Sequence, residues 1–246
     1  MINRRWRLPR RGRTLILGLV AGFLMNSCSA QPTAGWRPTP LPRQAGCAVA
    51  TAANSLCIVV LGDSIGVGAP LSGDDRWWVR LRGLLEASLP GRTIAIDNWA
   101  VSGSQVDFLE SAARDQPEIG TYDLAIVIEG VNDTYHTPAV AWRPRYEAAI
   151  SMLEAKGLMV VVTAPPPLLD DGAFGTQFDA TAAIVRAVAG AHRPLLDIAA
   201  RWRADGPVLA GTYYADAIHQ GPAGQRLMAT MARDVVLETI TPVASR

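Results

Sequence analysis

Short apolar runs alternate with amphipathic segments along most of this chain. The runs are rich in β-branched residues, which predicts five buried strands at 57–61, 93–96, 124–128, 158–163 and 194–198. Between them apolar residues recur about every 3.6 positions, which predicts helices at 75–89, 104–114, 139–156, 176–190 and 222–238. In the first helix the apolar face comprises Trp78, Leu81, Leu84 and Leu85. Strands that alternate with helices are typical of an α/β fold with a parallel sheet covered on both faces.

The beginning of the chain differs from the rest in charge and hydropathy. Residues 1–13 carry six arginines and no acid, and an apolar run at 14–25 follows them. A basic segment, a short apolar segment and then small residues are typical of a secretory signal. We therefore expect residues 1–30 to be a signal peptide and the protein to be exported, to the periplasm, the outer membrane or the medium.

Three outcomes of export are open at the end of this segment. Met25-Asn26-Ser27-Cys28 resembles a bacterial lipobox, in which Cys28 would be lipidated and would tether the protein to a membrane. The alternatives are ordinary cleavage after Ala30, with Cys28 discarded, and a retained membrane anchor. The residues that follow, 31–54, are rich in proline and read as a tether, and residues 55–240 read as one domain.

The two remaining cysteines, Cys47 and Cys57, lie at the entry to that domain. Export would place them where disulfides persist, so they can pair with each other. They can equally remain two buried thiols. We favour the disulfide, as a structural link rather than a catalytic one.

Composition limits the classes of function. The chain has 246 residues, 49% of them hydrophobic and 18% charged, which fits a globular domain with a sizeable core. Six of the 23 basic residues lie in residues 1–13, so the rest of the chain has 17 basic and 22 acidic residues. A domain with this balance has no electrostatic footprint for nucleic acid, so we expect none as a partner.

Most of the residues that could act in catalysis lie shortly after predicted strands. Ser64, Gly103 and Asn132 each come shortly after a strand, and Asp216 and His219 precede the last helix. A serine hydroxyl needs a neighbouring base, and a histidine needs an acceptor that holds its other nitrogen, so Ser64, His219 and Asp216 could form a triad. The backbone N–H groups of Ser64 and Gly103 and the side-chain amide of Asn132 could stabilise an oxyanion.

At these residues the chain resembles the SGNH (GDSL-like) hydrolase superfamily. The matching blocks are Gly62-Asp63-Ser64, Gly103, Gly130-Val131-Asn132-Asp133 and Asp216-Ala217-Ile218-His219. The resemblance implies a flavodoxin-like three-layer α/β/α sandwich and a catalytic Ser64, Asp216 and His219. It implies an oxyanion hole formed by Ser64, Gly103 and Asn132. It also implies hydrolysis of esters or thioesters, or acetyl transfer on carbohydrate, without a metal or organic cofactor.

Two rival assignments exist. Asp133 and His136 have the same spacing as Asp216 and His219, so His136 is an alternative base. The segment from Gly62 to Gly66 also matches the G-x-S-x-G elbow of α/β-hydrolases, but that fold would place several strands before the serine and here one precedes it. We expect Asp63 to support the site by hydrogen bonding.

The expected function is hydrolysis of short acyl or acetyl esters through an acyl-enzyme on Ser64. The substrate would be a small molecule or an ester of envelope carbohydrate or lipid. The alternatives are an O-acetyltransferase or deacetylase that acts on envelope polysaccharide, and a non-catalytic envelope-binding lipoprotein. Several segments are expected to shape the pocket: one of Trp77 and Trp78, Tyr213, Tyr214, helix 139–156 and loop 165–178.

Overall fold

A computed structural model describes Cys47 and residues 54–170, 172–190 and 192–241. The predicted signal peptide, Cys28 and most of the predicted tether lie outside these residues. Within them, no helix has the length and apolar character that a membrane crossing requires.

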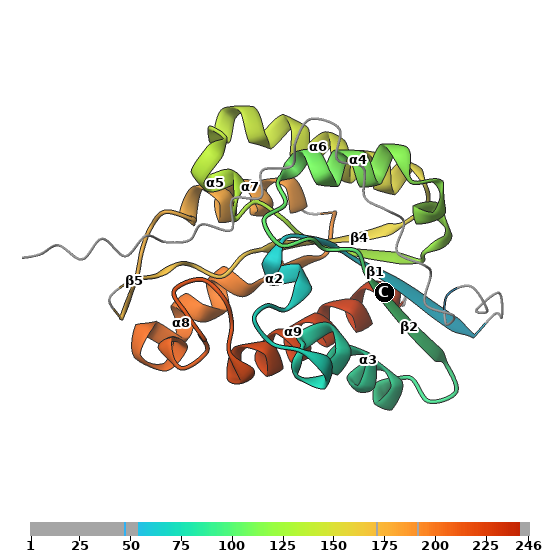
Figure 1. Cartoon of the computed structure of the whole chain (residues 1–246). Coiled ribbons are helices and arrows are strands. Elements are labelled where there is room, and N and C mark those ends of the chain that lie inside the picture. Colours follow the sequence, from blue (N-terminus) through green and yellow to red (C-terminus); the bar gives the residue numbers. More distant parts are fainter. Residues whose placement is uncertain (1–46, 48–53, 171, 191, 242–246) are drawn as a thin grey trace, which may run out of the picture.

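A five-stranded parallel sheet forms the centre of the fold (Figure 1). Its strands are β1 (Ser55–Gly62), β2 (Thr93–Asn98), β3 (Leu124–Ile128), β4 (Met159–Ala164) and β7 (Leu195–Asp197). They lie in the order β2-β1-β3-β4-β7, which is the flavodoxin-like order of a doubly wound sheet. The chain passes from β1 outward to β2 and then returns to the other side of β1 as β3. Ligands bind at such a switch point, beyond the carboxyl ends of the strands.

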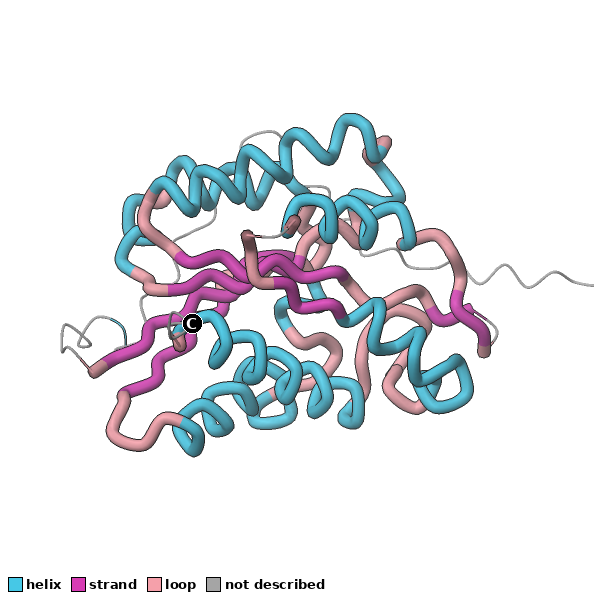
Figure 2. Tube along the Cα trace, turned by 180° about the vertical axis from the view of Figure 1, so that it is seen from behind, coloured by secondary structure: helices cyan, strands magenta, loops and turns pink. Residues whose placement is uncertain are grey.

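Helices cover both faces of the sheet, so the expected three-layer sandwich is confirmed (Figures 1 and 2). One layer holds α4 (Val106–Asp115), α6 (Ala139–Ala155) and α7 (Asp179–Ala189). The other holds α3 (Trp77–Ser88), α8 (Ile198–Gly211) and α9 (Pro222–Ile240). Short elements complete the chain: α2 (Ser64–Val67), α5 (Asp133–His136), the 3-10 turns Gly73–Asp75 and Pro117–Thr121, and the hairpin of β5 (Leu169–Asp170) and β6 (Ala173–Phe174).

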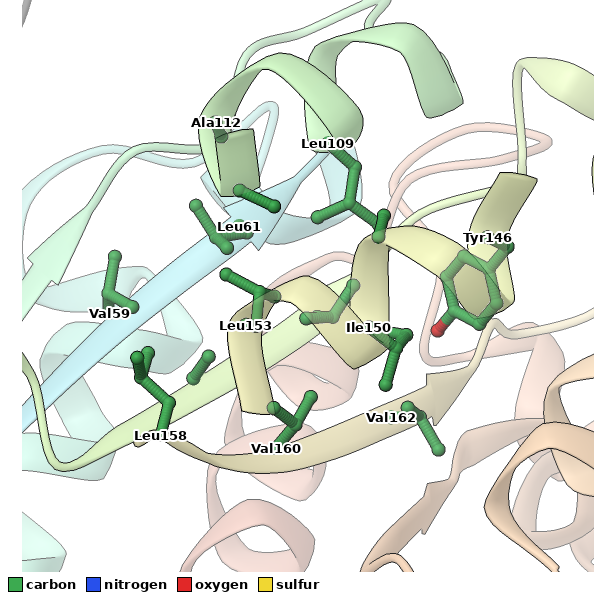
Figure 3. Close-up of a cluster of buried hydrophobic side chains, with 14 of the residues drawn as sticks. Val59, Leu61, Leu109, Ala112, Tyr146, Ile150, Leu153, Leu158, Val160 and Val162 are labelled. Carbon is green, nitrogen blue, oxygen red and sulfur yellow. The ribbon is translucent and has the colours of Figure 1, made fainter. Parts of the chain in front are cut away.

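Two apolar clusters, one on each face, explain why the strands read as continuous apolar runs. Leu56, Ile58 and Val60 of β1 belong to the layer of α3, α8 and α9. Cys57, Val59 and Leu61 belong to the layer of α4, α6 and α7, where Figure 3 shows side chains of β1, β4, α4 and α6 meeting. A strand that is buried on both faces needs apolar residues at every position rather than at alternate ones.

The buried face of α3 contains the four predicted residues and, in addition, Trp77. Trp77, Leu81 and Leu85 are fully buried, whereas Trp78 and Leu84 are only partly buried. Two adjacent tryptophans at the start of a helix leave its face ambiguous by one residue, which is about 100° of rotation. Packing decides it: Trp77 lies fully inside the domain, where its Nε1–H donates to the Ile65 carbonyl at 3.0 Å, and Trp78 lies at the edge of the same apolar cluster.

Helix α8 and the hairpin of β5 and β6 have no counterpart among the predicted elements. Gly206 and Pro207 lie within α8, and Gly206 has a positive φ of 75° that breaks the helix there. Glycine followed by proline is a turn signal in a sequence. For this reason the sequence pattern did not predict the helical turns on either side of it.

Cys47 and Cys57 are both buried in the apolar cluster beside α4 and α6. Their pairing stays a prediction.

Candidate active site

Ser64, His219 and Asp216 lie together, although 155 residues separate the first two. The His219 Nε2 is 2.9 Å from the Ser64 Oγ. On the other side of the ring, Nδ1 is 2.9 Å from the Asp216 Oδ2. This is the geometry of a nucleophile, a base and a carboxylate that orients the base.

The end of β1 fixes the position of Ser64. Gly62, the last residue of the strand, has a φ of 135°, and a Cβ there would lie 1.7 Å from the Ile128 carbonyl oxygen. Only glycine fits so close to β3. Asp63 then caps α2 by accepting the Ile65 N–H at 2.8 Å, so Ser64 begins the helix. The N–H of a residue in a first helical turn has no acceptor within the helix.

A tight turn before α9 holds the histidine. The Asp216 Oδ1 accepts the N–H of Ile218 at 2.8 Å and that of His219 at 2.7 Å. Partial burial favours the neutral acid, but the hydrogen bonds from His219 and Ile218 outweigh it and lower the pKa of Asp216 below its ordinary value. Asp216 is therefore charged at neutral pH. It holds a proton on the His219 Nδ1 and leaves Nε2 as the acceptor that faces Ser64.

Hydrogen bonds join the loops that carry Gly103 and Asn132 to the serine loop. The Ser104 Oγ lies 2.9 Å from the Gly62 carbonyl oxygen, and the Asn132 Nδ2 donates to the Ser104 carbonyl at 2.9 Å. Gly103 has a positive φ of 82°, a conformation that favours glycine. The structure thus links all three loops that were expected to form the oxyanion hole.

The rival base is elsewhere. His136 is exposed at the end of α5, beside the ring of Tyr135. Asp133 is buried, and its carboxylate accepts the Val106 N–H at the start of α4 at 3.1 Å. The histidine that the structure brings to Ser64 is His219.

Three buried carboxyl groups, those of Asp63, Glu129 and Asp133, lie beneath the site, and Glu129 was not among the residues predicted from the sequence. Burial raises the pKa of Asp63 to about 7 and that of Asp133 to about 6. Glu129 is fully buried directly after β3, and burial raises its pKa well above its ordinary value. The sequence signal that could have identified Glu129 is a glutamate directly after an apolar strand. Charged side chains are almost never fully buried unless they are paired.

The predicted pocket residues take different places. Trp77 is in the core, as expected of one of the pair, and the Trp78 Nε1–H donates to the Val67 carbonyl. Tyr213 is buried against Trp202 rather than bordering a cleft. The Tyr214 hydroxyl donates to the Pro167 carbonyl, which ties the loop after β4 to the histidine turn.

A cavity of about 130 Å³ lies between α5, α6 and α7. Its lining residues are Asp133, Thr134, Thr137, Ala139, Trp142, Gln177, Ala180 and Thr181. Helix 139–156 and the end of loop 165–178, through Gln177, therefore both contribute to this cavity. Among the residues that the structure describes, no group of three or more His, Cys, Asp or Glu side chains is arranged to hold a metal ion.

Comparisons with known proteins identify the family. Residues 60–227 match the model of the GDSL-like Lipase/Acylhydrolase family. A search of curated proteins finds no match.

Several solved structures share the fold. A lipase/acylhydrolase from Enterococcus faecalis is 20% identical with a TM-score of 0.63, over 77% of this chain and 100% of that one. An acetyl xylan esterase is 18% identical with a TM-score of 0.62, over 76% and 100%. A two-domain esterase active on acetylated mannans is 18% identical with a TM-score of 0.59, over 75% and 50%. At such identities the likeness shows the fold alone. The family match covers more than half of the chain, so this protein belongs to the GDSL-like lipase/acylhydrolase family and is a carboxylic ester hydrolase of the SGNH type.

Proposed function

We propose that this protein is a serine esterase that hydrolyses short acyl or acetyl esters through an acyl-enzyme on Ser64. The observation that carries the proposal is the contact of 2.9 Å between the His219 Nε2 and the Ser64 Oγ, with Asp216 on the far side of the ring. A serine hydroxyl becomes an effective nucleophile when a base takes its proton during attack.

The chemistry proceeds in two halves. The Ser64 Oγ attacks the ester carbonyl while its proton passes to the His219 Nε2, and Asp216 stabilises the imidazolium. The tetrahedral intermediate collapses, the C–O bond to the alcohol breaks, and His219 returns the proton to the leaving oxygen. Water then attacks the acyl-enzyme with His219 again as the base, which releases the carboxylic acid and frees Ser64.

The oxyanion would be stabilised by three donors. These are the N–H of Ser64, the N–H of Gly103 and the side-chain amide of Asn132. The amide nitrogen of Asn132 carries two hydrogens, and the Ser104 carbonyl uses one, so the second can serve the oxyanion. Preorganised donors of this kind are worth about 10²–10³ in rate each.

The exposure of the base supports hydrolysis over transfer. The side chains of His219 and Asp216 are 25% and 51% exposed, so water can reach the base and compete with any other acceptor. Similar folds include an acetyl xylan esterase and an esterase active on acetylated mannans, which supports an acetylated carbohydrate as one substrate class.

We further propose that the protein is exported and acts in the cell envelope. The basic and apolar segments of residues 1–30 support export, and the lipobox-like Met25-Asn26-Ser27-Cys28 supports a membrane tether at Cys28. Incorporation of labelled palmitate by the wild type but not by Cys28→Ala is the expected result. Cleavage after Ala30 without label would contradict the tether and leave export standing.

The test of the reaction uses p-nitrophenyl acetate, butyrate and octanoate with four proteins: wild type, Ser64→Ala, His219→Ala and His136→Ala. Loss of the nucleophile or the base should lower kcat by about 10⁴–10⁶, whereas His136→Ala, the matched histidine control, should keep wild-type rates. A loss of activity in His136→Ala alone would refute the assignment of the base. A folded wild type that is inert on all three esters would refute a simple esterase.

The acyl-enzyme and the substrate class need separate measurements. Intact mass spectrometry after brief mixing with substrate should show one acyl adduct on the wild type and none on Ser64→Ala. Release of acetate from acetylated xylan or mannan would support the carbohydrate substrate. Turnover of small esters with no release from either polysaccharide would contradict it and leave the esterase reaction intact.

A further inference from the structure

Glu129 is a buried acid with no cation to balance it. It follows the last residue of β3, and its side chain is fully buried. None of the ion pairs formed by the described residues includes it. A buried carboxyl group either gains a charged partner or stays neutral, because an isolated buried charge is very costly.

Hydrogen-bond geometry at Ser104 gives the protonation state. The Ser104 Oγ lies 2.9 Å from the Gly62 carbonyl oxygen and 3.0 Å from the Glu129 Oε2. A hydroxyl has one proton to donate, and a carbonyl oxygen can only accept. If Glu129 were ionised, two acceptors would compete for that proton, and one of the two short contacts would hold no hydrogen.

A proton on the Glu129 Oε2 satisfies every group. The acid then donates to the Ser104 Oγ, and the Ser104 hydroxyl donates to Gly62. The other oxygen, Oε1, accepts the Gly130 N–H at 3.2 Å. The geometry thus favours the neutral acid.

Burial and the neighbouring acids also favour the neutral form of Glu129. Burial raises its pKa most, and the carboxyl groups of Asp63, after β1, and Asp133, in α5, raise it further, whereas the hydrogen bonds with Ser104 and Gly130 lower it by less. From α6 the buried phenol of Tyr146 faces it, and its pKa is raised by burial and by Glu129.

The chain of hydrogen bonds reaches the residues of the proposed oxyanion hole. Gly62, beside the nucleophile, accepts from Ser104 and also from the Val101 N–H at 2.8 Å. The carbonyl of Ser104 accepts from Asn132. Glu129 therefore connects, through Ser104, the segments at the carboxyl ends of β1, β2 and β3.

We propose that Glu129 is a positioning residue: held as a neutral acid, it donates to Ser104 and so keeps the Gly103 loop and the Asn132 amide aligned with Ser64. This inference rests on the proposed function. It adds a residue that acts without touching the substrate.

Two substitutions separate the neutral acid from a carboxylate. Glu129→Gln keeps a donor toward Ser104 and an acceptor toward Gly130, so kcat should stay within about threefold of wild type. Glu129→Leu keeps the size but removes the donor, so kcat should fall by about 10–100-fold with KM little changed, which is less than the loss of a whole oxyanion donor. Ser104→Ala breaks the same chain at its next member and should give a similar loss.

The pH profile supplies a readout that packing alone would not move. Wild-type kcat should fall at alkaline pH as Glu129 ionises, and Glu129→Gln should lack that fall. The exposed Glu118 offers a matched control, because Glu118→Gln makes the same chemical change outside the site and should keep the wild-type profile. A Glu129→Gln variant as impaired as Glu129→Leu would overturn the proposal, as would a folded Glu129→Leu with full kcat.

A spectroscopic test does not depend on turnover or on a foldable Glu129→Leu. At neutral pH the infrared spectrum of wild type minus Glu129→Gln should contain the carbonyl band of a protonated carboxylic acid, and the Asn132 side-chain amide signals in NMR should shift in Ser104→Ala. A carboxylate band instead, or unshifted amide signals, would overturn the inference. If the wild type lacks esterase activity but shows the acid band, the proposed reaction has failed and the neutral acid stands.

Discussion

Replacement of Asp216 by asparagine is the sharpest test of the triad, because the backbone of the turn would fix the orientation of the asparagine amide. The Oδ1 of Asp216 accepts two backbone N–H groups, and Oδ2 faces the His219 Nδ1 at 2.9 Å. An asparagine has one oxygen, which the two N–H groups would retain. Its Nδ2 would then donate to Nδ1, place the ring proton on Nε2 and leave His219 unable to accept the proton of Ser64.

The magnitude follows from the distance and the exposure. Two unit charges 2.9 Å apart attract by about 1.4 kcal/mol in water and by about 6 kcal/mol at an effective dielectric constant of about 20. Because the Asp216 side chain is 51% exposed, the lower half of this range applies. Asp216→Ala should therefore lower kcat by about 10–500-fold. Asp216→Asn adds the wrong tautomer and should lower it by about 10²–10⁴, where the upper limit is the loss at a buried triad aspartate.

The assay is kcat on p-nitrophenyl acetate at neutral pH, with the residual rate of Ser64→Ala subtracted and thermal unfolding followed by circular dichroism as the folding control. The order should be wild type, then Asp216→Ala, then Asp216→Asn. An Asp216→Asn variant within threefold of wild type would refute the role of Asp216 in orienting His219. If Asp216→Ala is the slower of the two, the carboxylate acts through the backbone of the turn rather than through the tautomer.

The other predictions concern stability and the state of the two cysteines. Gly62→Ala should lower Tm by about 6 °C or more, since a Cβ would lie 1.7 Å from the Ile128 oxygen and the backbone would be strained by about 3 kcal/mol or more; an unchanged Tm would contradict the close approach. The Asp63 carboxyl keeps its proton to about pH 7 in the folded state and loses it near pH 3.8 when unfolded, so its contribution to stability falls as pH rises through this window. Asp63→Asn should flatten the dependence of Tm on pH there, and a slope equal to that of wild type would argue against the buried acid. Thiol titration of the unfolded, exported protein should find no free thiol at Cys47 and Cys57 if they pair as predicted, and two if they do not.

The sequence alone was sufficient for the five strands of the central sheet, for most helices and for the loops on which the proposed catalytic residues lie. Strands buried on both faces must be apolar throughout, so all five stand out as runs, and β3 has the predicted bounds. Ser64, Gly103 and Asn132 follow strands in the chain, and parallel strands bring their carboxyl ends to one edge of the sheet. Local pattern and fold class together thus predict which loops meet.

Tertiary structure decided what depends on contacts between distant residues. The buried face of α3 rests on Trp77 and its bond to Ile65, and α8 forms across the Gly206–Pro207 break because its apolar side packs on the sheet. No local pattern shows that His219 reaches Ser64 across 155 residues while His136 does not. The role of Glu129 likewise depends on its contact with the Ser104 hydroxyl of another loop, and a sequence pattern does not show this contact. Sequence encodes periodicity and local turn chemistry, whereas the pairing of polar groups across loops is set by packing in three dimensions.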